Sequence, residues 1–363
     1  MKTINPPIKL KLSIAPDTFN QLVIKWFKRY GRKDLPWQHN PTPYRVWISE
    51  IMLQQTQVNT VIPYYLKFMD VFPTLKALSF ATDEQVMTLW SGLGYYSRAR
   101  NLHKTALAVS TNTNNPSLPD TLDELMDLPG IGRSTAGAIL SLSMNKKAAI
   151  LDGNVKRVLA RHFQVSGWPG DSAVLKELWQ YAEILTPEKS VNQFNQAMMD
   201  IGATLCTRTK PSCSGCPLMD SCFANKAGNQ TDYPGKKKKK TLPIKHQYFY
   251  LLSNEQGELL MEKRPGSGIW GGLWTPPSSE TEQEIEHYLS EQLNVEISEI
   301  VMLPEFRHTF SHFHLQISPV KARLIAFNGT SENSLRWESV DNWLKQGIPA
   351  AVRIMLNSIK DEN

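Results

Sequence analysis

The chain has 363 residues, which is enough for two or three domains of ordinary size. Hydrophobic residues make up 41% of it and charged residues 20%, as is usual for a soluble globular protein. A net charge of +6 weakly favours an anionic partner such as nucleic acid. No run of about 18 apolar residues is present, and the segment before Pro16 lacks the apolar core of a signal peptide. We therefore expect a cytoplasmic protein with no membrane partner.

From Asp17 to about Leu205 the apolar residues recur at helical spacing. Asp17 is predicted to cap the first helix, whose apolar face includes Leu22 and Trp26. This pattern predicts a compact all-α unit without strands. Further helices are predicted near residues 44–55, 59–72, 83–91, 97–110, 122–125, 134–143, 154–163, 173–185 and 191–205.

Past residue 246 the hydrophobic period changes to two, which is typical of strands. Residues 247–261 are predicted to form a β-hairpin with its turn at Asn254–Gly257, and residues 311–326 a further strand. A helix is predicted between them, at residues 281–293. We therefore expect an α+β domain at residues 246–363.

Residues 229–245 are rich in lysine and interrupted by glycine and proline, which predicts a mobile linker. The run Lys236–Lys240 is open to two interpretations. It is either a solvated spacer or a tether that follows the phosphates of a nucleic acid.

All four cysteines lie in one short stretch, with six, two and five residues between them. A disulfide scaffold would spread its cysteines through the chain, whereas this cluster in a reducing compartment indicates metal ligands. Thiolates alone suit zinc or an iron–sulfur cluster. Zinc sites usually pair two CxxC motifs and this stretch has one, so we favour a structural [4Fe–4S] cluster. Its ligands would be Cys206, Cys213, Cys216 and Cys222.

The segment Leu128–Gly137 reads LPGIGRSTAG. Gly130 and Gly132 permit a tight turn between two helices, and the amides that open the second helix can hold a phosphate. An ordinary helix–turn–helix connection would also contain such glycines. The preceding Leu-Pro and the small residues that follow favour a DNA-binding helix-hairpin-helix.

Two carboxylates are candidates for catalysis. Glu50 is predicted to share a helix face with Val46 and Leu53, where burial would raise its pKa and keep it protonated as an acid. Alternatively, the carboxylate of Glu50 is exposed to solvent or forms an ion pair with an arginine. Asp152 opens a predicted helix and can be an N-cap. A fixed carboxylate there can also stabilise positive charge on a sugar during glycosidic cleavage, and the two roles are compatible.

Two short segments are candidates for insertion into DNA. Removing a base from the stack leaves a gap that a side chain must fill. Leu53–Gln57 reads LQQTQ at a helix end, and Gly92–Tyr96 places an aromatic residue after two glycines. Each is also compatible with a plain helix terminus or with packing.

Together these motifs resemble the adenine DNA glycosylases of the MutY type. The resemblance runs nearly without interruption over residues 20–225, with agreement in motif order and spacing, and continues at residues 306–314. It implies a multidomain protein, in which an all-α helix-hairpin-helix glycosylase with a [4Fe–4S] loop precedes an α+β Nudix-like domain. The motifs are LPW (35–37), PYRVWISEIMLQQTQV (43–58), GLGYYSRARNLH (92–103), LPGIGRSTAGAI (128–139), LDGNVKRV (151–158) and FNQAMMDIG (194–202).

The resemblance also implies roles for individual residues. Glu50 would protonate adenine at N7, Asp152 would stabilise the oxacarbenium ion, and Asn154 would position them. Gln55 and Tyr95 would insert around the lesion pair. The remaining implied contacts are Leu35, Trp37 and Gln196 in the adenine pocket and Phe310, Ser311 and His312 in a loop that reads 8-oxoguanine.

The implied partner is double-stranded DNA with adenine opposite 8-oxoguanine or guanine. The resemblance implies a bacterial, nucleoid-associated repair enzyme, and we expect a monomer. The helical domain is expected at residues 1–228, with one lobe near 31–132. The second lobe would combine about 17–30 with 133–228 and carry the cluster loop, 206–222.

Ser134 distinguishes the relatives of this family. The related endonucleases that remove thymine glycol have a lysine at this position. That lysine forms a Schiff base with the sugar, and the DNA strand is then cut. Serine cannot form an imine, so we expect a monofunctional enzyme that leaves an abasic site. A glycosylase with lyase activity and a non-catalytic DNA-binding or redox-sensing protein are the alternatives. The Glu50–Asp152 pair argues against the latter.

The C-terminal domain resembles the Nudix fold without its active site. A working Nudix helix carries several glutamates that hold Mg²⁺. Residues 282–291 read EQEIEHYLSE, which lacks the required order. We therefore expect a module that discriminates lesions and does not hydrolyse nucleotides.

Overall fold

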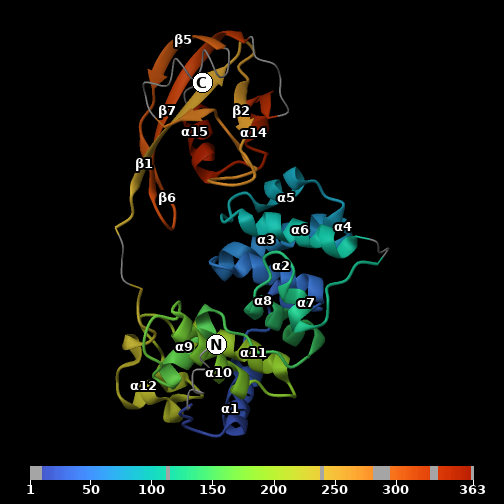
Figure 1. Ribbon diagram of the computed structural model, residues 1–363, viewed down its shortest axis with the longest axis vertical. Coiled ribbons are helices and arrows are strands. Elements are labelled where there is room, and N and C mark those ends of the chain that lie inside the picture. The colour runs from blue at the N-terminus through green and yellow to red at the C-terminus, as the bar shows by residue number, and fades with distance from the viewer. Residues whose placement is uncertain (1–9, 112–114, 238–240, 281–294, 328–333, 361–363) are drawn as a thin grey trace, which may run out of the picture. The chain divides into compact units, whose positions relative to one another are not determined.

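The computed structural model describes residues 10–111, 115–237, 241–280, 295–327 and 334–360 (Figure 1). Residues 1–79 and 104–238 form one compact unit, and residues 80–103 with 239–363 form a second. None of the helices in these described ranges is long and apolar enough to cross a membrane.

Up to residue 237, the described chain contains helices and turns only, as the hydrophobic spacing predicts. Two short helices, α4 and α12, were not predicted. The helices are α1 (Pro16–Tyr30), α2 (Pro43–Leu53), α3 (Val58–Val71), α4 (Leu75–Ser79), α5 (Asp83–Trp90), α6 (Ser97–Ser110), α7 (Leu122–Met126), α8 (Arg133–Ala138), α9 (Gly153–His162), α10 (Ser172–Leu185), α11 (Val191–Asp200) and α12 (Phe223–Lys226).

Short 3₁₀ and π turns extend or connect these helices. The π turns η2 (Ile139–Ser143) and η3 (Ile201–Leu205) continue α8 and α11. The 3₁₀ turns are η1 (Pro36–Gln38), η4 (Cys213–Gly215), η5 (Met219–Ser221) and η6 (Gln230–Asp232).

The ends of the first two helices differ from the prediction. The N-cap of α1 is Ala15, not Asp17, because Pro16 at the first helical position already has the φ that a helix requires. Asp17 lies in the first turn, where its negative charge interacts favourably with the positive end of the helix dipole. The helix α2 begins after Thr42, whose side chain accepts a hydrogen bond from Arg45 N, and ends at Leu53 instead of Gln55.

A buried core joins α1 to helices that lie far along the chain. Phe19 and Val23 pack with residues of α9, α10 and α11. The ring of Phe163 stacks on that of Tyr181, with centroids 4.0 Å apart. Burial of this apolar surface stabilises the association of the N-terminal helix with residues 151–218. The two-lobe boundaries stay a prediction.

The helices α7 and α8 form the expected hairpin. Gly130 has φ +80°, which a residue with a side chain rarely adopts, and Ile131 N donates to Leu128 O at 3.2 Å to close the turn. Gly132 is the N-cap of α8, and a Cβ at this position would meet no atom within 4 Å. The start of α8 therefore has open space beside Gly132.

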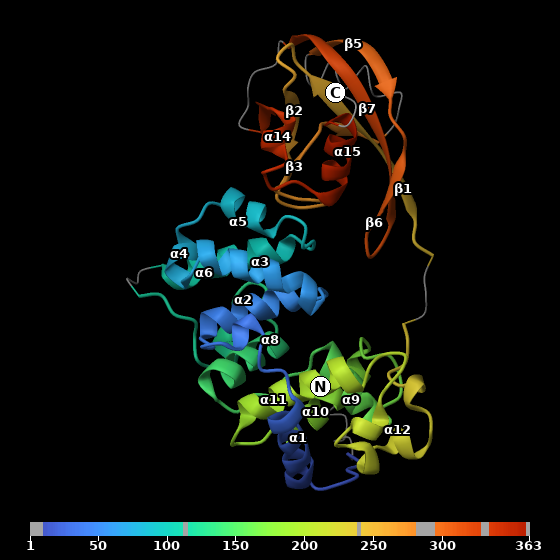
Figure 2. The same ribbon diagram turned by 180° about the vertical axis from the view of Figure 1, so that it is seen from behind.

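The second unit contains one sheet, in the order β3-β2-β1-β7-β5 (Figures 1 and 2). The long strands β1 and β7 are parallel neighbours, with Ile244 opposite His314 and Ser253 opposite Arg323. Its strands are β1 (Ile244–Ser253), β2 (Leu259–Lys263), β3 (Trp274–Thr275), β4 (Ser278–Ser279), β5 (Val295–Met302), β6 (Phe306–Thr309), β7 (His314–Phe327) and β8 (Leu335–Glu338), and α14 (Val340–Trp343) and α15 (Ala350–Lys360) follow.

The predicted hairpin and strand of this domain are confirmed with shifted ends. β1 and β2 flank the turn at Asn254–Gly257, where Gly257 N donates to Asn254 O at 3.0 Å. β7 covers most of residues 311–326, and β6 before it was not predicted. The predicted helix at 281–293, and with it the Nudix helix at 282–291, lies outside the described residues.

Candidate active site

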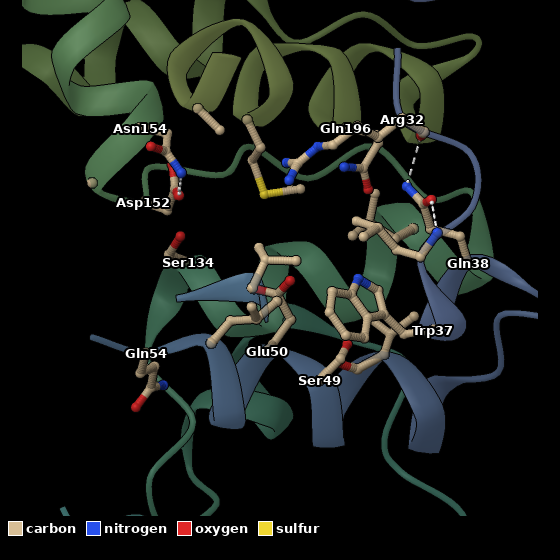
Figure 3. A pocket seen from close by; sticks show the side chains of 18 of the residues that line it. Arg32, Trp37, Gln38, Ser49, Glu50, Gln54, Ser134, Asp152, Asn154 and Gln196 are labelled. Carbon is tan, nitrogen blue, oxygen red and sulfur yellow. Dashed lines mark hydrogen bonds between the residues drawn. The ribbon is translucent and has the colours of Figure 1, made fainter. Parts of the chain in front are cut away.

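A cavity of about 980 Å³ opens in the first unit. Glu50 and Ser49 on α2 form one wall, and Asp152, Asn154 and Gln196 face them from α9 and α11 (Figure 3). The cavity therefore brings together the two carboxylates that the sequence singled out. Predicted residues that also line it are Leu35, Trp37, Gln55 and Ser134.

Glu50 lies half-buried at this cavity, on the same helix face as Val46 and Leu53. Burial raises the pKa of its carboxyl to about 8, and the negative charge of Asp152 contributes to the increase. The carboxyl is therefore mainly protonated at neutral pH. The sequence predicts the same protonated state, because it places Glu50 on an apolar helix face.

Asp152 is the N-cap of α9, as the sequence predicts. Its carboxylate accepts hydrogen bonds from Val155 N at 2.7 Å and from Asn154 Nδ2 at 3.0 Å. Burial raises the pKa of Asp152, while these hydrogen bonds and the charge of Arg157 oppose the increase. The cap thus fixes the carboxylate at the cavity wall.

Arg157 links this carboxylate to the cysteine loop. Its Nη2 donates to Asn154 Oδ1 at 2.9 Å and to Gly202 O at 2.5 Å, and its Nε donates to Cys206 O at 2.6 Å. A Cβ on Gly202 would lie 2.6 Å from Asn154 Cβ, so only glycine permits this approach. We did not single out Arg157 from the sequence, although it stands in the same LDGNVKRV motif as Asp152.

Ser134 lies in the first turn of α8, the helix that follows the hairpin. Its Oγ accepts a hydrogen bond from Leu151 N at 3.1 Å. The hydroxyl thereby ties the hairpin to the residue directly before Asp152. The structure thus gives Ser134 a positional role that the sequence did not reveal.

A buried ion pair stabilises another part of the wall. Asp200, which is 0% exposed, accepts hydrogen bonds from Arg32 Nη2 at 2.7 Å and Nε at 2.9 Å. Gln196 Nε2 donates to the same carboxylate at 3.0 Å. Sequence reasoning missed Arg32 and Asp200, since no spacing pattern joins residues 168 positions apart.

The segment after Arg32 carries the two predicted pocket residues. Gln38 Nε2 donates to Arg32 O at 3.0 Å, and Gln38 Oε1 accepts from Leu35 N at 3.1 Å (Figure 3). Trp37 is buried, with its ring edge-on to Tyr65 at 5.4 Å. These contacts give the cavity a flat apolar surface beside polar groups, which suits a planar base.

The candidate insertion residues occupy two different units. Gln55 is exposed with φ +58° after the end of α2 and lines the cavity. Tyr95 lies in the second unit, 46% exposed, with φ +50°. Both residues combine exposure with a left-handed backbone that few non-glycine residues adopt.

The predicted recognition loop lies at the turn between β6 and β7 in the second unit. Phe310 N donates to Phe313 O at 2.9 Å and closes the turn, which leaves Ser311 and His312 exposed. Phe310 packs against Trp270, with ring centroids 5.6 Å apart. The loop is thus anchored at its aromatic residue and open at its polar ones.

The four cysteines lie close enough for their charges to interact. Burial raises the pKa of Cys216 to about 12, and the three other thiolates contribute to the increase. Arg161 Nη1 donates to Cys206 Sγ at 3.3 Å, and Gln230 Nε2 to Cys213 Sγ at 3.7 Å. Within the described ranges, no three His, Cys, Asp or Glu side chains are placed to hold one metal ion. Four thiols with hydrogen-bond donors fit an iron–sulfur cluster by their chemistry.

Comparison with known proteins identifies both domains. Residues 48–183 match the HhH-GPD superfamily of base excision DNA repair proteins, and residues 248–358 match the NUDIX domain. An adenine DNA glycosylase of Buchnera aphidicola subsp. Acyrthosiphon pisum is 43% identical over 94% of this chain and 97% of its own length. That of Buchnera aphidicola subsp. Baizongia pistaciae is 40% identical over 95% and 97%.

Among solved structures, a thermostable thymine-DNA glycosylase superposes with a TM-score of 0.53 and 28% identity. It covers 58% of this chain and 97% of its own. The helical glycosylase fold and the following Nudix-like domain are therefore confirmed. On the identities to the two bacterial proteins over nearly its whole length, the chain belongs to the family of MutY-type adenine DNA glycosylases.

Proposed function

We propose that this protein removes adenine from double-stranded DNA where it stands opposite 8-oxoguanine or guanine, and leaves an abasic site. The observation that carries the proposal is the placement of Glu50 and Asp152 on facing walls of one cavity. One carboxyl is protonated at neutral pH and the other is fixed by hydrogen bonds to its own helix. Cleavage of an N-glycosidic bond uses this combination of acid and carboxylate.

Glu50 acts on the leaving base. Its proton passes to N7 of adenine while the bond between C1′ and N9 breaks, and the electron pair of that bond stays on the base. A pKa of about 8 keeps this proton available at neutral pH. Trp37 and Leu35 hold the base by its faces, and Gln196 offers a polar group to its edge.

Asp152 acts on the sugar. Departure of the base leaves positive charge on C1′ and the ring oxygen, which a fixed carboxylate stabilises. Asn154 orients this carboxylate through its hydrogen bond of 3.0 Å. Water then adds its oxygen to C1′ and gives up a proton to the ionised carboxylate of Glu50, which restores the acid, so free adenine and the abasic site are the only products.

Ser134 makes the reaction monofunctional. A Schiff base with the sugar needs an amine, and the hydroxyl of Ser134 instead accepts a hydrogen bond from Leu151 N. The strand therefore stays intact after the base has left.

The DNA is held by contacts that do not read its sequence. The amides at the start of α8, after Gly130 and Gly132, bind a phosphate, as helix N-termini do, and the open space beside Gly132 supports this contact. Gln55 and Tyr95 enter the duplex at the mispair, and their exposure supports this role. Lysines of the 229–245 linker add attraction to the phosphates.

The C-terminal domain reads the opposite base. Phe310, Ser311 and His312 contact 8-oxoguanine from the β6–β7 turn, which leaves the last two exposed. Residues 282–291 lack the order of glutamates that nucleotide hydrolysis needs. The domain thus contributes discrimination and no chemistry.

Cys206, Cys213, Cys216 and Cys222 hold one [4Fe–4S] cluster, which stabilises the loop at residues 206–222. Metal analysis of the purified protein tests this assignment, with about four iron atoms and matching sulfide per chain expected. One zinc ion per chain in place of iron would contradict it.

The protein works as a monomer on the bacterial nucleoid. Its two lobes, near residues 31–132 and near 17–30 with 133–228, bring Glu50 and Asp152 to one cleft. Sedimentation of the purified protein with and without duplex tests the monomeric state, and a dimer in either sample would contradict it.

A single-turnover assay on a duplex with adenine opposite 8-oxoguanine tests the function. Wild type should release adenine and give strand cleavage only after alkali, while Glu50→Gln should release none. An inactive wild type with full cluster content, or breaks formed without alkali, would overturn the proposal. A duplex with adenine opposite thymine serves as the control substrate.

A further inference from the structure

The loop between α5 and α6 carries the exposed ring of Tyr95, and its backbone has several positive φ angles. Gly92, Gly94 and Tyr95 have φ of +100°, +72° and +50°. Glycine adopts such angles freely, whereas a tyrosine keeps them only where its surroundings impose them. Tyr95 is 46% exposed, so burial of its ring in a core does not impose them.

Arg98, in the first turn of α6, holds the backbone of this loop. Its Nη2 donates to the carbonyl oxygens of Leu93 at 3.3 Å and of Gly94 at 3.1 Å. Trp90 Nε1 donates to the same oxygen of Gly94 at 3.2 Å. Two donors on one carbonyl fix the peptide group that directly precedes Tyr95.

The guanidinium of Arg98 also lies over two aromatic rings. Its central carbon is 5.4 Å from the ring centroid of Trp90 and 5.5 Å from that of Tyr95. Trp90 is fully buried, so the arginine connects the exposed ring to the interior of its unit. The planar guanidinium lies over both rings while its Nη2 donates to two carbonyl oxygens, and a lysine ammonium cannot stack on rings in this way.

We infer that Arg98 is a positioning residue that sets the backbone and ring of Tyr95 for insertion beside the mispair. Arg98 is only 9% exposed, so it acts through Tyr95 and does not contact the DNA. This inference rests on the proposed function, in which Tyr95 enters the duplex. Arg98 would affect the fraction of bound DNA in which the adenine has left the base stack. A correctly positioned Tyr95 ring lowers the free-energy cost of opening the stack.

A double-mutant cycle tests this assignment. The single-turnover rate constant is measured at saturating enzyme, on adenine opposite 8-oxoguanine, for wild type, Arg98→Met, Tyr95→Ala and the double variant. Arg98→Met should lower the rate constant roughly tenfold, a loss within the usual range of couplings between residues in contact. In the Tyr95→Ala background the same change should have no further effect.

Arg336→Met is the matched control, since Arg336 also lies over tryptophans, 4.5 Å from Trp274 and 4.9 Å from Trp343. Any loss it causes should be the same with and without Tyr95→Ala. Equal losses from Arg98→Met in both backgrounds would show a general structural role and overturn the inference. So would a wild-type rate for Arg98→Met.

If Arg98→Met does not fold, Arg98→Lys completes the cycle, because it keeps the charge and loses the planar guanidinium. Melting temperatures of all variants identify which case applies. A wild-type protein that releases no adenine contradicts the proposed function before the cycle begins. A fully active wild type with an additive cycle contradicts only the role of Arg98.

Discussion

Arg157 and Cys206 are joined by a hydrogen bond of 2.6 Å from the guanidinium Nε to the main-chain carbonyl. The same guanidinium holds Asn154 Oδ1 at 2.9 Å, and Asn154 holds Asp152 at 3.0 Å. Three consecutive contacts therefore connect the cysteine loop to the carboxylate in the cavity. The orientation of Asp152 therefore depends on the cysteine loop, whose residues Thr207 and Arg208 also line the cavity.

Arg157→Lys should lower the single-turnover rate constant about 10- to 100-fold, as loss of a group behind a reacting residue commonly does. Affinity for the duplex should change little, since the cavity wall and hairpin are retained. Arg161→Lys is the control, because Arg161 donates to Cys206 O and Thr207 O but not to Asn154. Its iron content should fall while the rate per iron-loaded molecule stays near wild type. Equal rate losses in both variants would contradict a specific link through Asn154.

The rate should depend on the protonation of Glu50. With a pKa of about 8, raised from 4.5, the acid loses its proton as pH rises through 8. The rate constant for base release should then fall about tenfold per pH unit. Single-turnover rates from pH 6 to pH 10 measure this, and a flat profile would exclude Glu50 as the acid.

The same pKa predicts how stability varies with pH. The folded chain holds the Glu50 proton between pH 4.5 and about 8, where the unfolded chain has released it. Glu50 therefore costs stability progressively as pH rises through this window. Glu50→Gln should melt above wild type at pH 9 and at the same temperature below pH 4.5. Thermal scans at both pH values test this, and an equal difference at both would contradict it.

Ser134→Lys should introduce lyase activity, because the hairpin places residue 134 at the cavity. Borohydride should trap a covalent complex with DNA that wild type does not form. The variant should also melt at a lower temperature, since the hydrogen bond from Leu151 N is lost. Ser134→Ala separates the effects, with lower stability and no trapping. Trapping by Ser134→Ala would assign the amine to another residue.

Gly202→Ala should disturb Asn154. The added Cβ would lie 2.9 Å from the backbone C and Cα of Asn154, so the helix start at Asp152 must shift. Overpacking of this kind costs about 1–3 kcal/mol, measurable by denaturant unfolding, and should reduce the rate of adenine release. Gly153→Ala, where a Cβ meets nothing within 4 Å, should have a much smaller effect. Similar losses in both variants would argue against the contact with Asn154.

Much of the cavity could be predicted from local sequence. Helical spacing places Glu50 on an apolar face, and an Asp before a helix predicts the cap that Asp152 forms. These features depend on residues three or four positions apart. The competing signal at Pro16 explains the wrong cap at Asp17, because proline fixed the helix start two residues earlier.

The contacts that unite the cavity could not be predicted in this way. The pairing of Arg32 with Asp200 joins residues 168 positions apart, and nothing in either neighbourhood indicates the other. The link from Arg157 to Cys206 likewise depends on how α9 packs against η3. Only the folded chain supplies these distances.

Glu50, Asp152 and Asp200 lie far apart along the chain. Their separation also determines at which point of synthesis the cavity can form. A nascent chain that has left the ribosome as far as Ser143 carries the acid but lacks the carboxylate that faces it. The wall at Arg32 is complete only once α11 has emerged and packed on α1. We therefore expect base excision only from chains whose first unit has folded, and no activity on DNA from incomplete translation products.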